Sequence, residues 1–508
     1  MKQYLLSVDN GGTYIKAAIY DKAGNQIGVT RRRNEVLEPS PGCSEYDQST
    51  LWQINCDCIK CVEAKTHIPA DQIACIGIAG QGCGFYSIDK DGNNIRNAIS
   101  SSDTRALRQS AELEERGINK TAFPYIYRNS TPGSLNSILI WLKENEPENY
   151  DRIDKLFSMK DFLVYRMTHN AVSGYGCQSA SGLMNLNTGK FCPRLGELFG
   201  IPEMIGKFGP LKWDHELCGT LTEDAAKNCA LKAGIPVSAG AHDVTAAVLA
   251  MNACDPDVCF MITGTHGING YIASEPILDG TVRNNEYFAF PGKYLIEEGY
   301  PSSTATLEWV ISLLFRGDPG GSSEIYDRIN REVESVDPND SNLIFLPFLR
   351  GNRDNNHAAG TWIGLRNEHT RPHLLAAVYE GVVFTHMLQM EHIFKSRDKP
   401  RKIRMAGGAT NSGIWMHIFA DTFNIPLEIV PNEEMGAKGA AIIAAVSVQM
   451  YPDFKTAINS MTRTGETVYP RKEYTDIYRK KLERFKTIVA SLDPCWEIFT
   501  QRQPLKEN

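Results

Sequence analysis

The chain has 508 residues, of which 42% are hydrophobic and 22% are charged, as is typical of globular proteins. A chain of this length is expected to form two domains, because single cores stop growing at roughly 250–300 residues. The net charge of -7 and a pI of about 5.9 argue against nucleic acid or an anionic membrane as the main partner, since both require a basic surface.

The N-terminal segment contains no recognisable secretion signal. Its apolar run is too short for a signal peptide and ends at Asp9. No window of the sequence approaches the roughly 18 apolar residues that a membrane span requires. We therefore expect a cytoplasmic protein.

The first half of the chain begins with a pattern of short strands and turns. Glycine-rich or polar turns at Asp9–Thr13 and Lys22–Asn25 separate short apolar runs, which predicts consecutive β-hairpins. Strands are predicted over residues 4–8, 16–20, 26–32 and 73–79, and an amphipathic helix over residues 50–64. The last of these strands ends at Gly80.

A similar pattern starts again near Asp257. Strands over residues 258–263 and 268–272 enclose a second glycine turn at Gly264–Gly267. Further helices are predicted over residues 304–315, 372–394, 412–423, 436–450 and 474–492, and strands over 403–405 and 427–430. The chain therefore resolves into two α/β halves, for which we predict domains 1–253 and 254–508.

The thirteen cysteines are scattered and odd in number, so a disulfide framework is not expected. Cys56, Cys58 and Cys61 form the one cluster, in which Cys58 and Cys61 have CxxC spacing. No second cysteine or histidine pair follows to complete a zinc site. Structural thiols are favoured over a metal or redox site, although the sequence leaves the role of the cluster open.

Each half contains a glycine turn whose backbone N–H groups are suited to phosphate oxygens. In the first turn, Gly11 and Gly12 allow close approach, Thr13 adds a hydroxyl group, and Lys16 adds charge. Asp9 is the kind of acid that holds Mg²⁺ through water. The second turn repeats the arrangement without an acid. An ordinary tight hairpin is the alternative for either turn alone, and neither a Walker A nor a GxGxxG sequence occurs.

Nearly the whole chain resembles the FGGY family of carbohydrate kinases. The most specific match covers Gly360–Leu365 and, after a gap of seven residues, His373–Glu380. Other family motifs follow in the expected order: Asp9–Thr13, Gly80-Gln81, Ser102–Arg105, Gly240–Asp243, Thr263–Thr265, Gly407–Ala409, Met405–Asp421, Glu434 and Gly439–Ala441. One signature departs from the family pattern, because Ile138 replaces the lysine that usually precedes the tryptophan, here Trp141.

The resemblance implies two ribonuclease H-like α/β domains of the actin and sugar-kinase superfamily, with the active site in a cleft between them. The N-terminal domain would hold the sugar, the first phosphate loop and the catalytic acid. The C-terminal domain would bind the nucleotide. The implied donor is ATP with Mg²⁺, and the implied partner is a small sugar, with no nucleic acid or membrane.

Asp243 is the predicted catalytic base. It follows a small-residue turn and precedes a predicted helix, so the residues alone fit a helix N-cap equally well. The resemblance implies instead that Asp243 accepts the proton of the sugar hydroxyl during attack on the γ-phosphate of ATP. Asp9, acting on Mg²⁺, would offset the phosphate charge.

The resemblance also implies the residues that bind ATP. Backbone and hydroxyl groups of the two turns would contact phosphates, and residues of the second half would surround the adenosine. The predicted ATP-binding residues are Gly12, Thr13, Tyr14, Lys16, Gly264, Thr265, Glu308, Gly407, Gly408, Asn411 and Ser412. His266 stands where the family often has serine, and its role is left open between a phosphate contact and a surface residue.

The predicted sugar-binding residues are Gln81, Gly82, Cys83, Asp103, Arg105 and Asp243. For Asp103 and Arg105, a loop ion pair is the alternative. Cys83 replaces a histidine found in xylulose kinases, which removes a strong hydrogen-bonding partner and puts a D-xylulose pocket in doubt.

Asn97–Asp103, Phe345–Leu349 and Glu380–Met387 resemble L-xylulose kinases, so L-xylulose is the expected substrate. D-xylulose, L-ribulose, L-fuculose and erythritol remain open, as does a homodimeric assembly. A phosphatase or ATPase of the same superfamily is disfavoured by the Asp103/Arg105 unit and the FGGY signature. A non-catalytic sugar sensor is disfavoured by the presence of Asp243.

Overall fold

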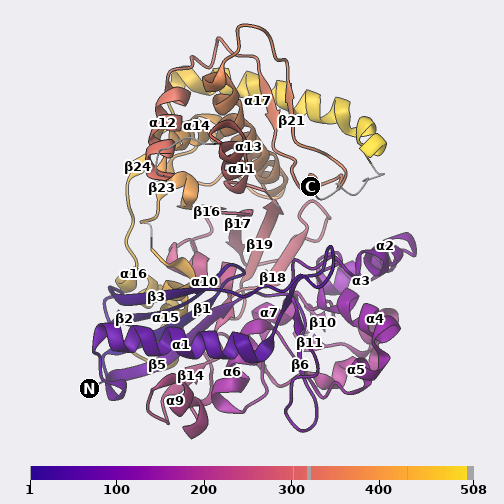
Figure 1. Cartoon of the computed structure of the whole chain (residues 1–508), viewed down its shortest axis with the longest axis vertical. Coiled ribbons are helices and arrows are strands. Elements are labelled where there is room, and N and C mark those ends of the chain that lie inside the picture. The colour runs from indigo at the N-terminus through magenta and orange to yellow at the C-terminus, as the bar shows by residue number, and fades with distance from the viewer. Residues whose placement is uncertain (1, 301, 317–321, 432, 500–508) are drawn as a thin grey trace. The chain divides into compact units, whose positions relative to one another are not determined.

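The structure is a computed structural model that describes residues 2–300, 302–316, 322–431 and 433–499. The chain forms two compact units (Figure 1). Unit 1 comprises residues 1–254, 272–296 and 433–463, and unit 2 comprises residues 255–271, 297–432 and 464–508. The boundary predicted at 253/254 lies beside the first division. Two later stretches nevertheless return to unit 1, so one boundary does not describe these units.

Unit 1 opens with the predicted hairpins. Its elements up to residue 168 are β1 (Tyr4–Asn10), β2 (Tyr14–Asp21), β3 (Gln26–Arg33), β4 (Glu45–Tyr46), α1 (Gln48–Thr66), β5 (Ile73–Gly80), β6 (Tyr86–Ile88), β7 (Ala98–Ile99), α2 (Leu107–Glu115), α3 (Ile118–Ile126), α4 (Leu135–Asn145), α5 (Pro147–Asp151), β8 (Lys155–Phe157) and α6 (Met159–Thr168).

The remaining elements of unit 1 include three that come from its two later stretches. They are β9 (Ser173–Gly174), α7 (Tyr175–Ser179), β10 (Met184–Asn185), β11 (Lys190–Phe191), α8 (Pro193–Leu198), β12 (Leu211–Lys212), β13 (Leu217–Thr220), α9 (Glu223–Cys229), β14 (Pro236–Ser238), β15 (Ala241–His242), α10 (Asp243–Ala250), β18 (Asn284–Tyr287), α15 (Met435–Ser447) and α16 (Phe454–Met461).

The main sheet of unit 1 runs β13-β14-β5-β1-β2-β3, with β15 also paired to β5. Alternate side chains of a strand point to opposite faces. Leu6 and Val8 of β1 share a hydrophobic core with α1 on one face. On the other face α15 packs against β5, because a Cβ atom at Gly77 would lie only 2.0 Å from the carbonyl oxygen of Ala440. Asp9 follows Val8, so its side chain points to the α15 face.

The small residues of α15 explain why this late segment belongs to unit 1. A Cβ atom at Gly439 would lie 1.9 Å from the carbonyl oxygen of Ala246 in α10, so the two helices pack backbone to backbone. Glycine at Gly77 allows the same closeness to β5. The small-residue helix predicted over 436–450 is confirmed, and its close approach to a neighbour is a property of this packing.

Unit 2 contains the second hairpin and most of the remaining helices. Its elements, including two strands that cross a unit boundary, are β16 (Val258–Thr263), β17 (Gly267–Ala273), β19 (Tyr294–Tyr300), α11 (Ala305–Leu314), α12 (Ser322–Glu334), β20 (Ile344–Leu346), β21 (Thr361–Ile363), α13 (Arg371–Phe394), β22 (Lys402–Gly407), α14 (Gly413–Phe423), β23 (Leu427–Ile429), β24 (Thr467–Val468) and α17 (Lys472–Leu492). Strands β17, β16, β22, β23 and β24 are neighbours in that order.

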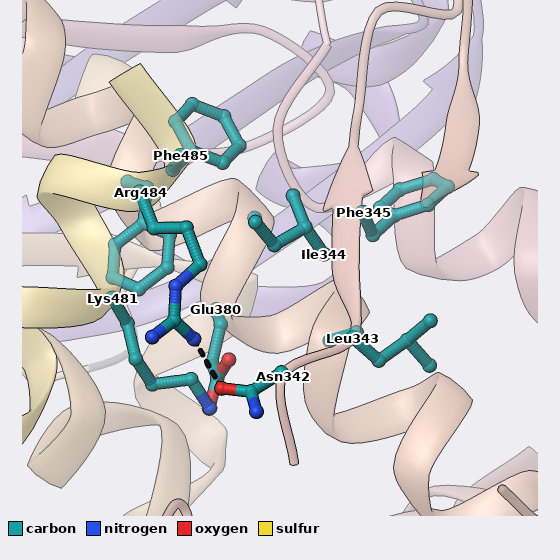
Figure 2. Close-up of a pocket in the computed structure, with 11 residues that line it drawn as sticks. Asn342, Leu343, Ile344, Phe345, Glu380, Lys481, Arg484 and Phe485 are labelled. Carbon is teal, nitrogen blue, oxygen red and sulfur yellow. Dashed lines mark hydrogen bonds and ion pairs between the residues drawn. The ribbon is translucent and has the colours of Figure 1, made fainter. Parts of the chain in front are cut away.

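The C-terminal helix α17 is anchored to α13 by a buried ion pair. Lys481 Nζ lies 2.6 Å from Glu380 Oε1, and Arg484 donates a hydrogen bond to Asn342 (Figure 2). The cavity around these side chains has a volume of about 10 Å³, which is room for about one water molecule. This part of unit 2 is therefore packed interior rather than a ligand pocket.

The predicted elements are confirmed with shifts of a few residues at their ends. Cys56 and Cys58 are buried on α1, and the Cys56 and Cys229 sulfur atoms lie 3.4 Å apart as free thiols. Within the described residues, no group of three or more histidine, cysteine or acidic side chains is placed to hold a metal ion. Within the same residues, no helix combines the length and apolarity that crossing a membrane would need.

Candidate active site

Three strand ends of unit 1 bring the predicted acids to one edge of its sheet. Strands β1 and β15 both pair in parallel with β5, so that Asn10 and His242 each lie opposite Gly80. Asp9 therefore lies near the end of one strand, and Asp243 directly follows another. Carboxyl ends of parallel strands are where open α/β sheets commonly bind ligands.

Asp9 is buried among other charged groups. Its Oδ2 lies 3.7 Å from Lys16 Nζ, which in turn lies 2.6 Å from Glu434 Oε2. A Cβ atom at Gly436 would lie 2.6 Å from the Asp9 carboxylate, so the N-terminus of α15 abuts this side chain. Burial raises the pKa of Asp9 to about 6, and the charges of Asp243 and Glu434 add to the effect, while Lys16 opposes it.

This charge balance fits a divalent cation. Asp243 and Glu434 place two further negative charges near Asp9, and Lys16 opposes their effect. Magnesium prefers oxygen ligands and usually keeps several waters, with only one or two protein carboxylates. A single buried acid together with nucleotide oxygens would suffice for such a site.

The first glycine turn is open to solvent. Gly11 N–H donates to the Tyr14 carbonyl oxygen over 3.1 Å, while Thr13 and Tyr14 are exposed. A Cβ atom at Gly12 would lie 2.9 Å from Gln81 Nε2. The turn therefore touches the predicted sugar-binding segment after β5, and a larger residue at Gly12 would displace Gln81.

Asp243 is the first residue of α10 and is half-buried. Its Oδ1 accepts from Val244 N–H over 2.8 Å and lies 2.9 Å from His242 Nε2. No hydrogen bond from the described residues reaches Oδ2. The N-cap position belongs to His242, with no capping bond from its side chain. The N-cap alternative for Asp243 is thus not what the structure adopts, and one carboxylate oxygen is left available.

Three residues beside Asp243 were not predicted as site residues. His242 Nδ1 lies 3.4 Å from Glu286 Oε2, and Arg128 Nη1 lies 2.7 Å from Glu286 Oε1. Glu286 lies on β18, far from Asp243 in sequence. The sequence offered one signal, a histidine directly before the predicted base, but Glu286 and Arg128 meet it only in the fold.

The predicted sugar-binding residues are divided between two surroundings. Gln81 and Cys83 are half-buried, and Cys83 Sγ lies 4.0 Å from the Ala180 carbonyl oxygen. Gly82 is buried, and a Cβ atom there would lie 2.7 Å from His242 Cδ2. Gln81, Gly82 and Cys83 therefore belong to the same sheet edge as Asp243.

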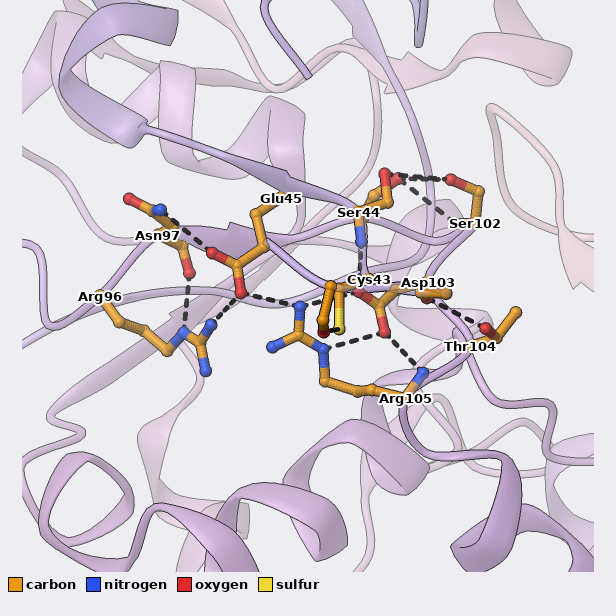
Figure 3. A network of polar contacts seen from close by, with 12 residues as sticks. Cys43, Ser44, Glu45, Arg96, Asn97, Ser102, Asp103, Thr104 and Arg105 are labelled. Carbon is orange, nitrogen blue, oxygen red and sulfur yellow. Dashed lines mark hydrogen bonds and ion pairs between the residues drawn. The ribbon is translucent and has the colours of Figure 1, made fainter. Parts of the chain in front are cut away.

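Asp103 and Arg105 form a buried ion pair (Figure 3). Asp103 Oδ1 accepts from Arg105 Nε over 2.9 Å, and Asp103 Oδ2 accepts from Ser44 N–H over 2.6 Å. Arg105 also reaches Glu45 over 2.7 Å and lies over the ring of Trp141. Both carboxylate oxygens of Asp103 accept hydrogen bonds. This geometry is the one expected for a loop ion pair, the alternative to a direct sugar contact.

The same network extends to the neighbouring segment. Arg96 bridges Glu45 and Glu146, and Asn97 donates to Glu45 over 3.0 Å. Figure 3 shows Arg96, Asn97 and Arg105 converging on Glu45. The network fixes the segment that carries Ser102, so Asp103 and Arg105 shape this loop whatever else they contact.

The second glycine turn lies in unit 2 and contains no acid. Thr304 N–H and Oγ1 both donate to the Gly264 carbonyl oxygen, over 3.0 and 2.8 Å. Ser303 N–H donates to the Thr265 carbonyl oxygen over 3.1 Å. Thr263 pairs with Gly407, and a Cβ atom at Gly407 would lie 2.3 Å from the Thr263 carbonyl oxygen. Gly264, Thr265 and Gly407 therefore form one continuous backbone surface.

A cavity of about 370 Å³ opens beside this surface in unit 2. Four residues predicted to bind ATP line it: Glu308, Gly408, Asn411 and Ser412. Its other lining residues are Thr304, Leu307, Ser323, Tyr326, Asp327, Asn330, Tyr379 and Trp415. Such a volume is within the usual range for small-molecule sites.

One wall of the cavity is aromatic and tightly hydrogen-bonded. The rings of Tyr379 and Trp415 stack with centroids 4.1 Å apart. Asn330 Oδ1 accepts from Ser412 Oγ over 2.7 Å and from the Tyr379 hydroxyl over 2.9 Å. A flat aromatic wall next to amide and hydroxyl groups suits a purine and its ribose. Sequence reasoning missed Trp415 and Asn330 because each lies in an ordinary helical pattern.

Comparison with known proteins matches the two halves of the chain to the two domains of one protein family. The N-terminal domain of the FGGY family of carbohydrate kinases matches residues 4–250, and the C-terminal domain matches residues 259–448. These ranges are consecutive in sequence and together cover most of the chain.

Two relatives match nearly end to end. L-xylulose/3-keto-L-gulonate kinase of Escherichia coli is 33% identical, covering 97% of this chain and 98% of that protein. A protein named probable L-xylulose kinase, from Pasteurella multocida, is 32% identical over 96% of this chain and 99% of its own length.

The crystal structure of xylulose kinase from Rhodospirillum rubrum has a TM-score of 0.89 with this structure. It is 23% identical, and the match covers 97% of this chain and 100% of that one. The predicted two-domain α/β sugar-kinase fold is therefore confirmed.

Proposed function

This chain belongs to the FGGY family of carbohydrate kinases, and from that premise we propose that it transfers the γ-phosphoryl group of ATP to a hydroxyl group of a ketopentose such as L-xylulose. Kinases of this family use ATP as the phosphate donor. The observation that carries the proposal is the geometry of Asp243, whose Oδ1 is held by two neighbours while Oδ2 is available.

Asp243 is the general base in this proposal. Its Oδ2 accepts the proton of the sugar hydroxyl as that oxygen forms a bond to the γ-phosphorus. The bond between the γ-phosphorus and the bridging β–γ oxygen breaks, and ADP leaves with the electron pair. The products are a sugar phosphate, ADP and a proton held on Asp243 until solvent removes it.

In this proposal the two glycine turns bind the phosphate groups. In unit 1, the N–H groups of Gly12, Thr13 and Tyr14, together with the Lys16 ammonium, are suited to phosphate oxygens. In unit 2, Gly264 and Thr265 offer the same kind of surface. Asp9 would hold Mg²⁺ through water, and the ion supplies charge neutralisation of the phosphate groups when bound.

The nucleotide occupies the unit 2 cavity in this proposal. Gly407 and Gly408 carry no side chain to obstruct it, and the cavity beside them is lined by the Tyr379–Trp415 stack. Asn411 and Ser412 offer polar groups for the ribose. Glu308, which lies on helix α11, also lines the cavity. These positions come from the cavity and from the family resemblance together.

The sugar occupies the strand-end edge beside Asp243. Gln81, Gly82 and Cys83 contact it directly in this proposal, while Asp103 and Arg105 hold the loop at Ser102 in place. L-xylulose is preferred because two near-full-length relatives carry that name. D-xylulose, L-ribulose, L-fuculose and erythritol remain competitors, and the name of the E. coli relative adds 3-keto-L-gulonate.

The test is a coupled ADP-release assay with the purified protein over these six compounds, with and without Mg²⁺. We expect L-xylulose to give the largest kcat/KM and Asp243→Asn to lower kcat about 1,000-fold with every active sugar. If no sugar stimulates ADP release, the kinase proposal fails. If another compound exceeds L-xylulose, only the assigned substrate changes.

A further inference from the structure

His242 lies between two carboxylates from different elements of unit 1. Its Nε2 is 2.9 Å from Asp243 Oδ1, and its Nδ1 is 3.4 Å from Glu286 Oε2. Glu286 is almost fully buried on β18 and is held in turn by Arg128 over 2.7 Å. The contacts therefore run without a break from Arg128 through Glu286 and His242 to Asp243.

Nε2 of His242 faces Asp243 Oδ1, whereas Nδ1 is buried 3.4 Å from Glu286 Oε2 and makes no hydrogen bond to any described residue. With a carboxylate beside each nitrogen, the ring is favoured as the imidazolium, in which both nitrogens carry a proton and neither can accept one from a substrate. His242 is therefore placed to hold Asp243 and not to replace it as a base.

Gly82 makes room for the imidazole ring. A Cβ atom at position 82 would lie 2.7 Å from His242 Cδ2 and 2.9 Å from Nε2. Contacts below 3.0 Å force a displacement, so any side chain at position 82 would push the ring away from Asp243. The segment after β5 and the ring are thus sterically matched.

The charges around the ring favour its protonated form. Burial would lower the pKa of His242, but the carboxylates of Asp243 and Glu286 more than offset this and raise it well above its usual value. Asp214 and Cys177 are the other titratable groups close enough to interact with it. Burial likewise opposes ionisation of Glu286, yet His242 and Arg128 hold the pKa of that carboxyl below its usual range.

We propose that His242 is a positioning residue: clamped between Asp243 and the Glu286–Arg128 pair, it fixes Oδ1 of Asp243 so that Oδ2 is presented to the acceptor hydroxyl. The inference rests on the proposed function, because it assigns the task for which Asp243 is held. A carboxylate with one fixed oxygen loses rotational freedom, and a misplacement of about 1 Å in such a group costs on the order of 100-fold in rate.

Substitution of the ring provides the first test. We expect His242→Ala to lower kcat about 100-fold, with KM for ATP changed less than twofold because the nucleotide cavity lies in unit 2. His242→Gln should recover part of the loss, since its amide can still donate to Asp243. The control is His357→Gln, which removes an exposed imidazole of unit 2 and should leave kcat unchanged.

The steric match with Gly82 gives a second test that changes no titratable group. We expect Gly82→Ala to lower kcat roughly as much as His242→Ala, because the methyl group displaces the ring. Combined in one protein, the two substitutions should cost no more than either alone, since interacting sites are not additive. Additive losses would mean that the methyl group acts on the sugar itself, and would overturn the assignment.

Glu286→Gln tests the pH dependence of kcat, which a purely structural role of His242 would leave unchanged. Removing this charge lowers the pKa of the imidazolium, so the alkaline decline of kcat should begin at lower pH than in the unaltered protein. An unchanged pH profile would overturn the proposal. Thermal unfolding of each variant shows whether a loss of activity reflects misfolding, and Gly82→Ala and Glu286→Gln decide the matter if His242→Ala does not fold.

Asp243→Asn, measured in the same series, separates the two levels of inference. If Asp243→Asn retains nearly the full rate, the proposed base is wrong and the role of His242 fails with it. If Asp243→Asn is inactive while His242→Ala and Gly82→Ala keep kcat within twofold, the proposed base stands and only the positioning role is lost.

Discussion

The two glycine turns have similar backbones but very different electrostatic surroundings. The turn of unit 1 lies beside Asp9, Lys16 and Glu434, and the buried Asp9 has its pKa raised to about 6. The turn of unit 2 is held by Thr304 and Ser303 and opens beside a cavity that is lined by the Tyr379–Trp415 stack and, among others, by Glu308 and Asp327. In the proposed function, similar N–H surfaces would therefore serve different tasks: charge handling and proton transfer in one unit, and nucleotide binding in the other.

If this division is correct, substitutions in unit 1 should change kcat and those in unit 2 should change KM for ATP. Asp243→Asn should have the largest effect. We expect kcat to fall about 1,000-fold, within the 10²–10⁴ range of general-base catalysis, while KM for ATP stays within twofold. Steady-state ADP-release kinetics measure both. Asp71→Asn, an exposed acid of the same unit, is the matched control and should retain full activity.

Gly436→Ala should come next. Its methyl group would lie 2.6 Å from the Asp9 carboxylate and push it out of place, so we expect kcat to fall about 100-fold. Gly206→Ala adds a methyl group where nothing lies within 4 Å and should be neutral. A normal kcat for Gly436→Ala, with folding verified by circular dichroism, would show that the position of Asp9 is unimportant.

In unit 2, Tyr326→Ala should raise KM for ATP and leave kcat unchanged. Tyr326 lines the cavity proposed for the nucleotide and is 38% exposed, so its loss should not disturb the core. An aromatic contact contributes about 0.5–1.5 kcal/mol, which corresponds to a roughly 2- to 10-fold rise. Tyr469→Ala, with a side chain 66% exposed outside the cavity, serves as the control. A fall in kcat with unchanged KM would contradict the division between the units.

The smallest effect on activity is expected for Asp214→Asn, which tests charge in the interior of unit 1. Burial raises the pKa of Asp214 to about 7, partly opposed by Lys160, and neither carboxylate oxygen has a hydrogen-bond partner among the described residues. The folded protein thus binds the proton more tightly than the unfolded chain. Its stability should therefore fall as pH rises from about 4 to about 7.

Asp214→Asn should remove this dependence. Relative to the unaltered protein, the variant should gain free energy of unfolding between pH 4 and pH 7 and keep a constant advantage above pH 7. Urea unfolding at several pH values measures the difference. A variant that is less stable at pH 8 would show that the Asp214 carboxylate is compensated in the fold.

Much of the fold could be predicted from local patterns. The strand–glycine turn–strand units at Asp9–Thr13 and Gly264–Gly267 appear as predicted, since short apolar runs and turn residues act over neighbouring positions. The return of residues 433–463 to unit 1 could not be predicted this way. It depends on Gly439 and Gly77 meeting partners nearly 200 or more residues away, which no local pattern encodes.

The candidate site shows the same division. Glu308, Gly408, Asn411 and Ser412 were predicted and line one cavity. Asp103 and Arg105 were predicted as sugar contacts, and that role stays a prediction beside the ion pair that they form. Trp415 and Asn330 were missed, because a cavity wall is defined by the side chains that face it and not by their spacing.

The sequence alone identified the family and the order of the motifs and singled out Asp243 as the candidate base, because these inferences depend on residue types at fixed spacing. Only the tertiary structure decided how Asp243 is held. Val244, His242, Glu286 and Arg128 come from separate elements, and their mutual distances arise when β15, β18 and the segment after α3 pack together. Electrostatic coupling depends on separation in space, so it appears only once the chain has folded.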